Sequence, residues 1–123
     1  NLDGRPQASE ILAAADARSV ALSPTPAFDG SLEDAQVVFS PQHGAGVLTV
    51  AGLAPAPSDH TYEIWIISDA REHPAGLFQP GADGRAEVLI EGDLAAGVMV
   101  AITVEPDGGS PAPTGDVLLA ARL

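Results

Sequence analysis

Three histidines are the side chains of this 123-residue chain most suited to holding a metal ion. His43, His60 and His73 each lie in a segment that we predict to be a loop, and none has a second histidine two or four positions further on. If the three met at one end of a sandwich, they could bind zinc together with Asp69 or Glu72. Solvated, unpaired loop histidines are much commoner, so we predict that they form no metal site.

Other catalytic arrangements are also missing from the sequence. The chain has no cysteine, which excludes a thiolate nucleophile, a disulfide and a blue-copper site. No serine lies in the G-x-S-x-G pattern of hydrolases, and 17 carboxylates make chance acidic pairs too common to indicate glycoside hydrolysis. Gly108-Gly109-Ser110 lacks the lysine of a phosphate-binding loop, so a turn is the better interpretation. We predict a non-enzymatic protein without catalytic, cofactor-binding or metal residues.

The charge of the chain limits its partners. The net charge is −12, with five arginines and no lysine. Such a surface repels phosphate backbones and anionic membrane surfaces, so we expect no nucleic-acid binding by this segment. The acidic residues are spread along the chain, which is typical of a solvated surface rather than of an acidic arm.

The strand predicted over residues 61–68 is the element around which the others would be arranged. It holds the only tyrosine and the only tryptophan, Tyr62 and Trp65, within a β-branched run. Alternation would place Tyr62, Ile64 and Ile66 on one face and Glu63, Trp65 and Ile67 on the other. We interpret Trp65 as a core anchor rather than a platform on which a ligand stacks.

The remaining pattern predicts an all-β fold, an antiparallel β-sandwich of about eight short strands with a short N-terminal helix. The helix would cover 9–16 and place Ile11, Leu12 and Ala15 on one face. The Asp83-Gly84 pair predicts a hairpin between its neighbouring strands. The predicted strands are 18–22, 35–39, 47–51, 61–68, 75–79, 85–90, 98–105 and 117–121.

A ten-residue loop, 106–115, follows the most regular strand pattern in the chain. Alternation in that strand would place one set of residues on one face, Val98, Val100, Ile102 and Val104, and the other set on the opposite face, Met99, Ala101, Thr103 and Glu105. Three interpretations of the loop remain open: a tucked-in Ω-like loop that covers one sandwich end, a partner-binding loop, or an unstructured tip, which its prolines disfavour. Glu105 and Asp107 are expected to hydrogen-bond neighbouring backbone amides.

Three segments together resemble the extracytoplasmic domain of anti-sigma-K factors of the RskA type. They are the segment from Tyr62 to Ile67, the segment Pro74-Ala75-Gly76-Leu77-Phe78, and the stretch Val100 to Gly115 with its Thr-Val-Glu-Pro, Gly-Gly-Ser-Pro and Pro-Thr-Gly parts. Their order and spacing match that family over about 8–123. The 102–115 segment is the most specific part, because composition alone would not produce it.

The resemblance implies a topology and a mechanism. Residues 8–123 would be the outer domain of a single-pass membrane protein, and residues 1–7 a juxtamembrane linker. An absent cytoplasmic region would sequester an extracytoplasmic-function sigma factor. A site-1 protease and then an intramembrane protease would release that factor and so change transcription. The family offers no catalytic residue to carry over.

A second hypothesis is a secreted β-sandwich that binds a small ligand or a metal through the loops that carry the three histidines. A metal titration followed by thermal unfolding separates the two hypotheses, because binding to the folded state raises the melting temperature.

Overall fold

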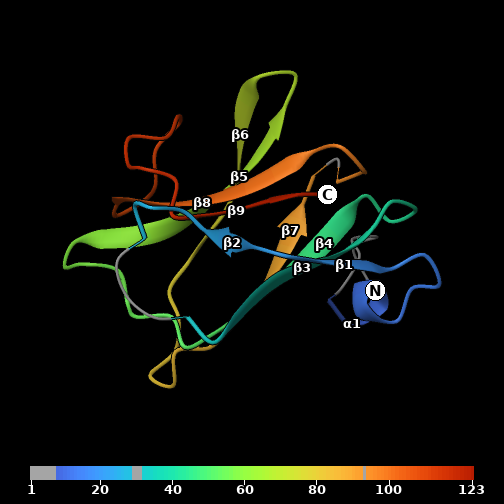
Figure 1. Ribbon diagram of the computed structural model, residues 1–123, viewed down its shortest axis with the longest axis horizontal. Helices are drawn as coiled ribbons and strands as arrows, with labels where there is room; N and C mark the ends of the chain where they lie inside the picture. The colour runs from blue at the N-terminus through green and yellow to red at the C-terminus, as the bar shows by residue number, and fades with distance from the viewer. Residues whose placement is uncertain (1–7, 29–31, 93) are drawn as a thin grey trace.

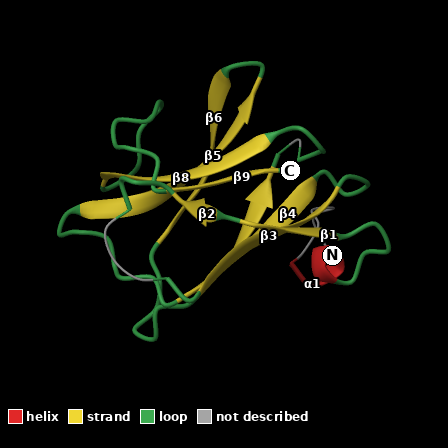
Figure 2. Cartoon of the chain, in the orientation of Figure 1, coloured by secondary structure: helices red, strands yellow, loops and turns green. Residues whose placement is uncertain are grey.

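The chain folds into two antiparallel sheets packed face to face, with one short helix (Figures 1 and 2). This computed structural model describes residues 8–28, 32–92 and 94–123. Sheet A has the strand order β1-β3-β4-β7, and sheet B has the order β2-β9-β8-β5-β6. The all-β sandwich prediction is confirmed. The elements are α1 (Ala8–Leu12), β1 (Arg18–Ala21), β2 (Ser23–Pro24), β3 (Asp34–Ser40), β4 (Ala45–Ala51), β5 (His60–Ser68), β6 (Arg71–Phe78), β7 (Ala86–Glu91), β8 (Met99–Pro106) and β9 (Leu119–Arg122).

The main core lies between the sheets and follows the predicted alternation of β5 and β8. Tyr62, Ile64 and Ile66 face inward from β5, and Val100 and Ile102 do so from β8. The Tyr62 ring stacks on that of Phe78 with 5.3 Å between centroids. The Tyr62 hydroxyl donates to the Ala54 carbonyl oxygen over 2.6 Å, which satisfies its one buried polar group. Sheet A completes this core with Val37, Phe39, Leu48, Val50 and Ile90.

Each sheet also has a partly covered outer face. On sheet A, Ile11 of α1 packs against Ala45 and Val47, which point away from the main core. On sheet B, the 106–115 loop folds back over β5 and β8 and is hydrogen-bonded to their outward-facing side chains. The helix and the loop each cover the outer face of strands whose inner face already packs in the core. The strands β4, β5 and β8 are therefore buried on both faces.

Three element predictions need correction. The helix ends at Leu12, and Leu12 is 44% exposed, so only Ile11 of the predicted apolar face is buried. Residues 23–24, which lie outside the predicted strand 18–22, form β2 because β9 offers them a pairing edge. The polar segment that begins at Arg71 is already strand: β6 pairs with β5 from Arg71 onward, across a two-residue turn. An exposed edge strand needs no apolar alternation, which is why its sequence resembles a turn.

The predicted Asp83-Gly84 hairpin is wrong in its pairing. The turn itself forms, with Gly84 at φ +76° and the Gly81 N–H donating to the Arg85 carbonyl oxygen over 2.8 Å. The strands on its two sides belong to different sheets, however, because β6 pairs with β5 and β7 pairs with β4. The turn therefore carries the chain from one layer of the sandwich to the other.

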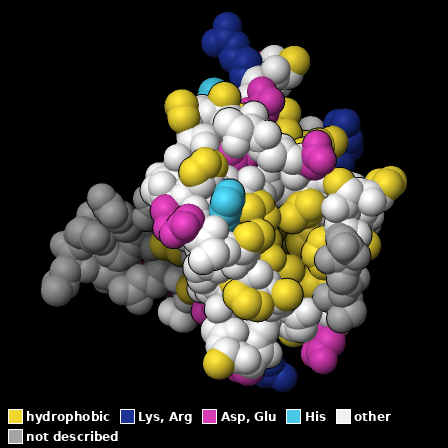
Figure 3. Space-filling view, turned by 90° about the vertical axis from the view of Figure 1, so that its left-hand side faces the viewer, with side chains coloured by type: hydrophobic (Ala, Val, Ile, Leu, Met, Phe, Trp, Pro, Cys, Tyr) yellow, Lys and Arg dark blue, Asp and Glu magenta, His cyan; other side chains and the backbone are white. Residues whose placement is uncertain are grey.

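The surface agrees with the predicted spread of acidic residues. Acidic side chains are scattered over the face in Figure 3 and do not gather in one block. Among the described residues, no helix is long and apolar enough to cross a membrane.

Candidate functional site

The feature with the most unusual chemistry is a pair of buried carboxylates on the outer face of sheet B. Glu63 on β5 is 3% exposed and Glu105 on β8 is fully buried. Glu63 pairs with Thr103, two residues before Glu105, so both carboxylates point away from the main core. A buried ionised carboxylate is stable only when donors replace its lost water. The 106–115 loop and the neighbouring strand supply those donors.

Glu105 is the centre of a connected hydrogen-bond network. The Trp65 indole N–H donates to Thr103 Oγ1 over 2.8 Å, and the Thr103 hydroxyl donates to Glu105 Oε2 over 2.5 Å. From the loop, the Thr114 N–H donates to Oε1 over 3.0 Å and the Thr114 hydroxyl donates to the same oxygen over 2.5 Å. The Gly115 N–H contacts Oε2 over 3.3 Å. Glu105 thereby joins the far end of the loop to β8, the strand that precedes it. The prediction that Glu105 hydrogen-bonds nearby backbone amides is confirmed.

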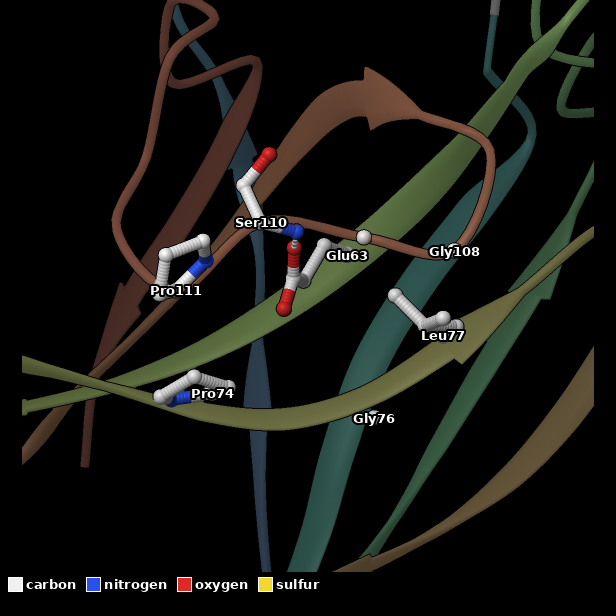
Figure 4. Close-up of a pocket in the computed structure, with 8 residues that line it drawn as sticks. Glu63, Pro74, Gly76, Leu77, Gly108, Ser110 and Pro111 are labelled. Atoms are coloured by element: carbon white, nitrogen blue, oxygen red, sulfur yellow. Dashed lines mark hydrogen bonds between the residues drawn. The ribbon is translucent and has the colours of Figure 1, made fainter.

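Glu63 holds the near part of the loop. The Ser110 N–H donates to Glu63 Oε1 over 2.8 Å, and Figure 4 shows this contact beside Gly108 and Pro111. The loop is therefore tucked in and not an unstructured tip, but it covers the outer side chains of β5 and β8, whereas the Ω-like interpretation placed it over one end of the sandwich. It lies on the outer face of sheet B rather than hanging free.

The two carboxylates differ in acidity because their donors differ. Burial alone would raise the pKa of Glu105, but the hydrogen bonds from Thr103, Thr114 and Gly115 outweigh it and lower that pKa to about 2. Burial raises the pKa of Glu63, the single Ser110 N–H opposes the rise, and the nearby Glu105 carboxylate adds to it. Both carboxylate oxygens of Glu105 accept hydrogen bonds from the protein, whereas Glu63 accepts one, from the Ser110 N–H.

Two glycines of the loop are required by this arrangement. A Cβ on Gly115 would lie 2.4 Å from the Val104 carbonyl oxygen, closer than any real contact. Gly109 has φ +79°, and a Cβ there would lie 2.8 Å from the Leu77 side chain. The glycines, Thr114 and Glu105 of the 102–115 segment therefore all serve one structure. The turn predicted at Gly108 to Ser110 is present: Gly108 and Gly109 have positive φ, and the Gly109 N–H donates to the Pro106 carbonyl oxygen over 2.9 Å.

Acid should weaken the fold through Glu105. The folded-state pKa of about 2 lies below the ordinary glutamate pKa of 4.5, so the stabilising effect of Glu105 is complete above pH 4.5 and is lost as the pH falls toward 2. We expect the free energy of unfolding to fall over that window, by about 3 kcal/mol from this group. Thermal unfolding of the wild type and of Glu105→Gln at several pH values tests it: the stability gap between them should narrow below pH 4.5. A gap independent of pH would contradict the assignment.

A second polar cluster fastens the segment after α1 to the β3–β4 turn. The buried Ser40 hydroxyl donates to Asp16 Oδ1 over 2.6 Å and lies 2.8 Å from His43 Nδ1, and the Gln42 N–H donates to Asp16 Oδ2 over 2.9 Å. The hydrogen bonds from Ser40 and Gln42 lower the pKa of Asp16. This is a serine, a histidine and an acid brought together, which the sequence had not indicated. The carboxylate binds the serine and not the histidine, however, so the order differs from that of a hydrolytic triad.

The three histidines lie in separate places. His43 is in the β3–β4 turn beside Ser40, whereas His60 begins β5 and its Nδ1 lies 2.7 Å from the Ser58 carbonyl oxygen. His73 lies on the exposed part of β6. The prediction that all three are in loops is therefore wrong for His60 and His73. In the described ranges, no group of three or more histidine, aspartate or glutamate side chains is placed to hold a metal ion.

Comparison with known proteins gives a consistent result. The family model described as the C-terminal part of anti-sigma-K factor rskA matches residues 2–117. An uncharacterized protein in the phr 5′ region of Streptomyces griseus is 35% identical over 108 residues, which cover 88% of this chain and 43% of the relative. No solved structure matches the chain significantly.

Two relatives carry the name anti-sigma-K factor RskA. That of Mycobacterium sp. (strain KMS) is 34% identical over 107 residues, covering 87% of this chain and 42% of the relative. That of Mycobacterium tuberculosis (strain H37Rv) is 34% identical over 112 residues, covering 90% of this chain and 46% of the relative. The chain thus spans less than half the length of these relatives. It belongs to the family of anti-sigma-K factor RskA C-terminal domains.

Proposed function

We propose that this chain is the extracytoplasmic, non-enzymatic regulatory domain of a membrane-bound anti-sigma factor. It controls the release of an extracytoplasmic-function sigma factor, and hence transcription, by deciding when a site-1 protease reaches the segment that links it to the membrane. An intramembrane protease then completes the release. The single observation that carries this proposal is family membership over residues 2–117, and the relatives named anti-sigma-K factor are about twice as long as this chain.

The fold offers a physical means of control at its N-terminal end. Residues 1–7, the proposed juxtamembrane linker, lead into α1, which is only five residues long and too short to be stable alone. Its one buried side chain is Ile11, which packs on Ala45 and Val47 of β4. The Asp16 contacts with Ser40 and Gln42 then fix the following segment. Undocking α1 would lengthen the cleavable segment without unfolding the main core.

Replacing Ile11 by alanine should therefore loosen the N-terminal segment selectively. Loss of a buried isoleucine costs roughly 2–5 kcal/mol, and here the loss falls on α1 alone. We expect a protease of broad specificity, such as proteinase K, to cut within residues 8–15 at least about tenfold faster than in the wild type, since cleavage follows the population of the opened form. Mass spectrometry of timed digests measures it. The neighbouring Leu12→Ala is the matched control because Leu12 is 44% exposed; equal acceleration in both variants would argue against docking by Ile11.

The regulatory role itself needs the parent protein in cells. A reporter driven by the cognate sigma factor should respond when residues 8–123 are deleted from the parent, and should respond in the same direction to Ile11→Ala. Immunoblotting of the parent protein should show a parallel change in the site-1 fragment. If neither the deletion of residues 8–123 nor Ile11→Ala alters the reporter output or the amount of site-1 fragment, the proposal is refuted.

A further inference from the structure

A shallow groove of about 420 Å³ lies between β6 and the first half of the 106–115 loop. Pro74 and Leu77 line it on the β6 side and Pro111 on the loop side (Figure 4), and Gly109 also belongs to the lining. Leu77 is 44% exposed, one of two large apolar side chains with that much exposure among the described residues. The groove is thus open to solvent and has a mixed polar and apolar lining, which includes the Glu63 side chain.

Glu63 presents an oxygen to this groove that nothing in the described chain satisfies. Oε1 accepts the Ser110 N–H, but no hydrogen-bond donor among the described residues reaches Oε2. Figure 4 shows this second oxygen pointing into the space between Pro74 and Pro111, whereas the Ser110 hydroxyl points away from it. Glu63 is 3% exposed, and since no fully buried side-chain oxygen among the described residues lacks a hydrogen-bond partner, its Oε2 is the part of the side chain that solvent reaches through the groove.

The charge around Glu63 has one sign only. Burial has the larger effect in raising the pKa of Glu63, and the neighbouring Glu105 carboxylate raises it further. Leu77 and Thr103 flank Glu63 on the adjacent strands, and neither is charged. On the rest of β6, Arg71, Glu72 and His73 pair with the other end of β5. A buried anion left without a counter-ion favours a cation that enters from outside.

We propose that this groove binds a cationic group on an aliphatic stem, such as the guanidinium or ammonium group of an arginine or lysine side chain. The charged head would donate to Glu63 Oε2, and the methylenes would lie against Pro74, Leu77 and Pro111. The net charge of −12 attracts such a ligand before contact. The inference does not depend on the proposed function and concerns a site of its own.

The test is an NMR titration of the ¹⁵N-labelled chain with N-acetyl-arginine amide, N-acetyl-lysine amide and butylamine. We expect chemical-shift changes confined to the backbone amides of residues 108–110 and of β6, with a Kd on the order of 1–10 mM. N-acetyl-citrulline amide, a neutral analogue of the arginine compound, should not bind. If butylamine binds as well as the amino-acid amides, the cationic group and its aliphatic stem are sufficient for binding. If only the amino-acid amides bind, the groove also contacts the peptide groups of its ligand.

Variants separate the carboxylate from general attraction. Glu63→Gln keeps an acceptor for the Ser110 N–H and should weaken binding about tenfold or more. Glu72→Gln makes the same charge change on an exposed part of β6 and should leave binding within about twofold, since exposed charges act weakly. In case Glu63→Gln folds poorly, the wild type gives an independent readout: a bound cation must lower the pKa of the Glu63 carboxyl, followed by its ¹³C signal. Equal binding by Glu63→Gln, binding of the citrulline compound, or an unmoved Glu63 titration would each overturn the proposal.

Discussion

Replacing Trp65 by alanine is expected to lower the free energy of unfolding by about 3–5 kcal/mol. The indole is fully buried on the outer face of sheet B, so its loss leaves a large cavity beside Ala101, its partner on β8. It also removes the N–H that donates to Thr103, which in turn orients the Thr103 hydroxyl toward Glu105. The measurement is urea unfolding followed by circular dichroism.

Trp65→Phe separates the two contributions. It keeps most of the ring volume but removes the indole N–H, so it should cost about 1–2 kcal/mol. Retained stability in Trp65→Ala would show that the outer face of sheet B is not a second core.

Glu105→Gln should have the second largest effect, a loss of roughly 2–4 kcal/mol at neutral pH. The amide matches the carboxylate in shape but replaces one acceptor oxygen with an NH₂ group. That group would face the donors of Thr114 or of Thr103 and Gly115, which all need an acceptor. The loop would then leave the sheet or keep unsatisfied donors.

A charge-matched control shows whether the effect is local. Glu87 is an exposed carboxylate on β7, and Glu87→Gln makes the same chemical change with an expected effect within about 0.5 kcal/mol. Similar losses in the two variants would mean that net charge, and not the Glu105 network, governs stability.

The sequence predicted the parts of the fold that hydrophobic alternation controls. The strands β5 and β8 have their predicted faces, because Tyr62, Ile64, Val100 and Ile102 can be buried only by facing the other sheet. It failed at β6 and at β2, where pairing partners and not side chains decide the structure. It also failed for the Asp83-Gly84 turn, since a turn signal says nothing about which sheet each strand will join.

The candidate site was predictable in part. The resemblance located the 102–115 segment, and Glu105 was expected to bind backbone amides. Glu63 was missed as a binding residue because, among 17 carboxylates, a buried one has no local signature. Its environment comes from Ser110, 47 residues away, and only the folded chain shows that contact. The Asp16–Ser40 contact escaped prediction for the same reason.

These contacts give the family segment a physical meaning. Thr103, Glu105, Gly109, Thr114 and Gly115 hold the 106–115 loop against sheet B. The 102–115 segment therefore fixes the position of the loop on sheet B. The groove that we propose as a cation site forms where this loop lies beside Glu63 and β6.

Amide hydrogen exchange at Ser110 and Thr114 tests most directly the claim that two buried carboxylates hold this loop. Their N–H groups donate to Glu63 and Glu105, so both should exchange far more slowly than those of an unstructured loop. In Glu105→Gln the protection of Thr114 should fall by at least about tenfold. Exchange at unstructured-chain rates for both amides in the wild type would contradict the account.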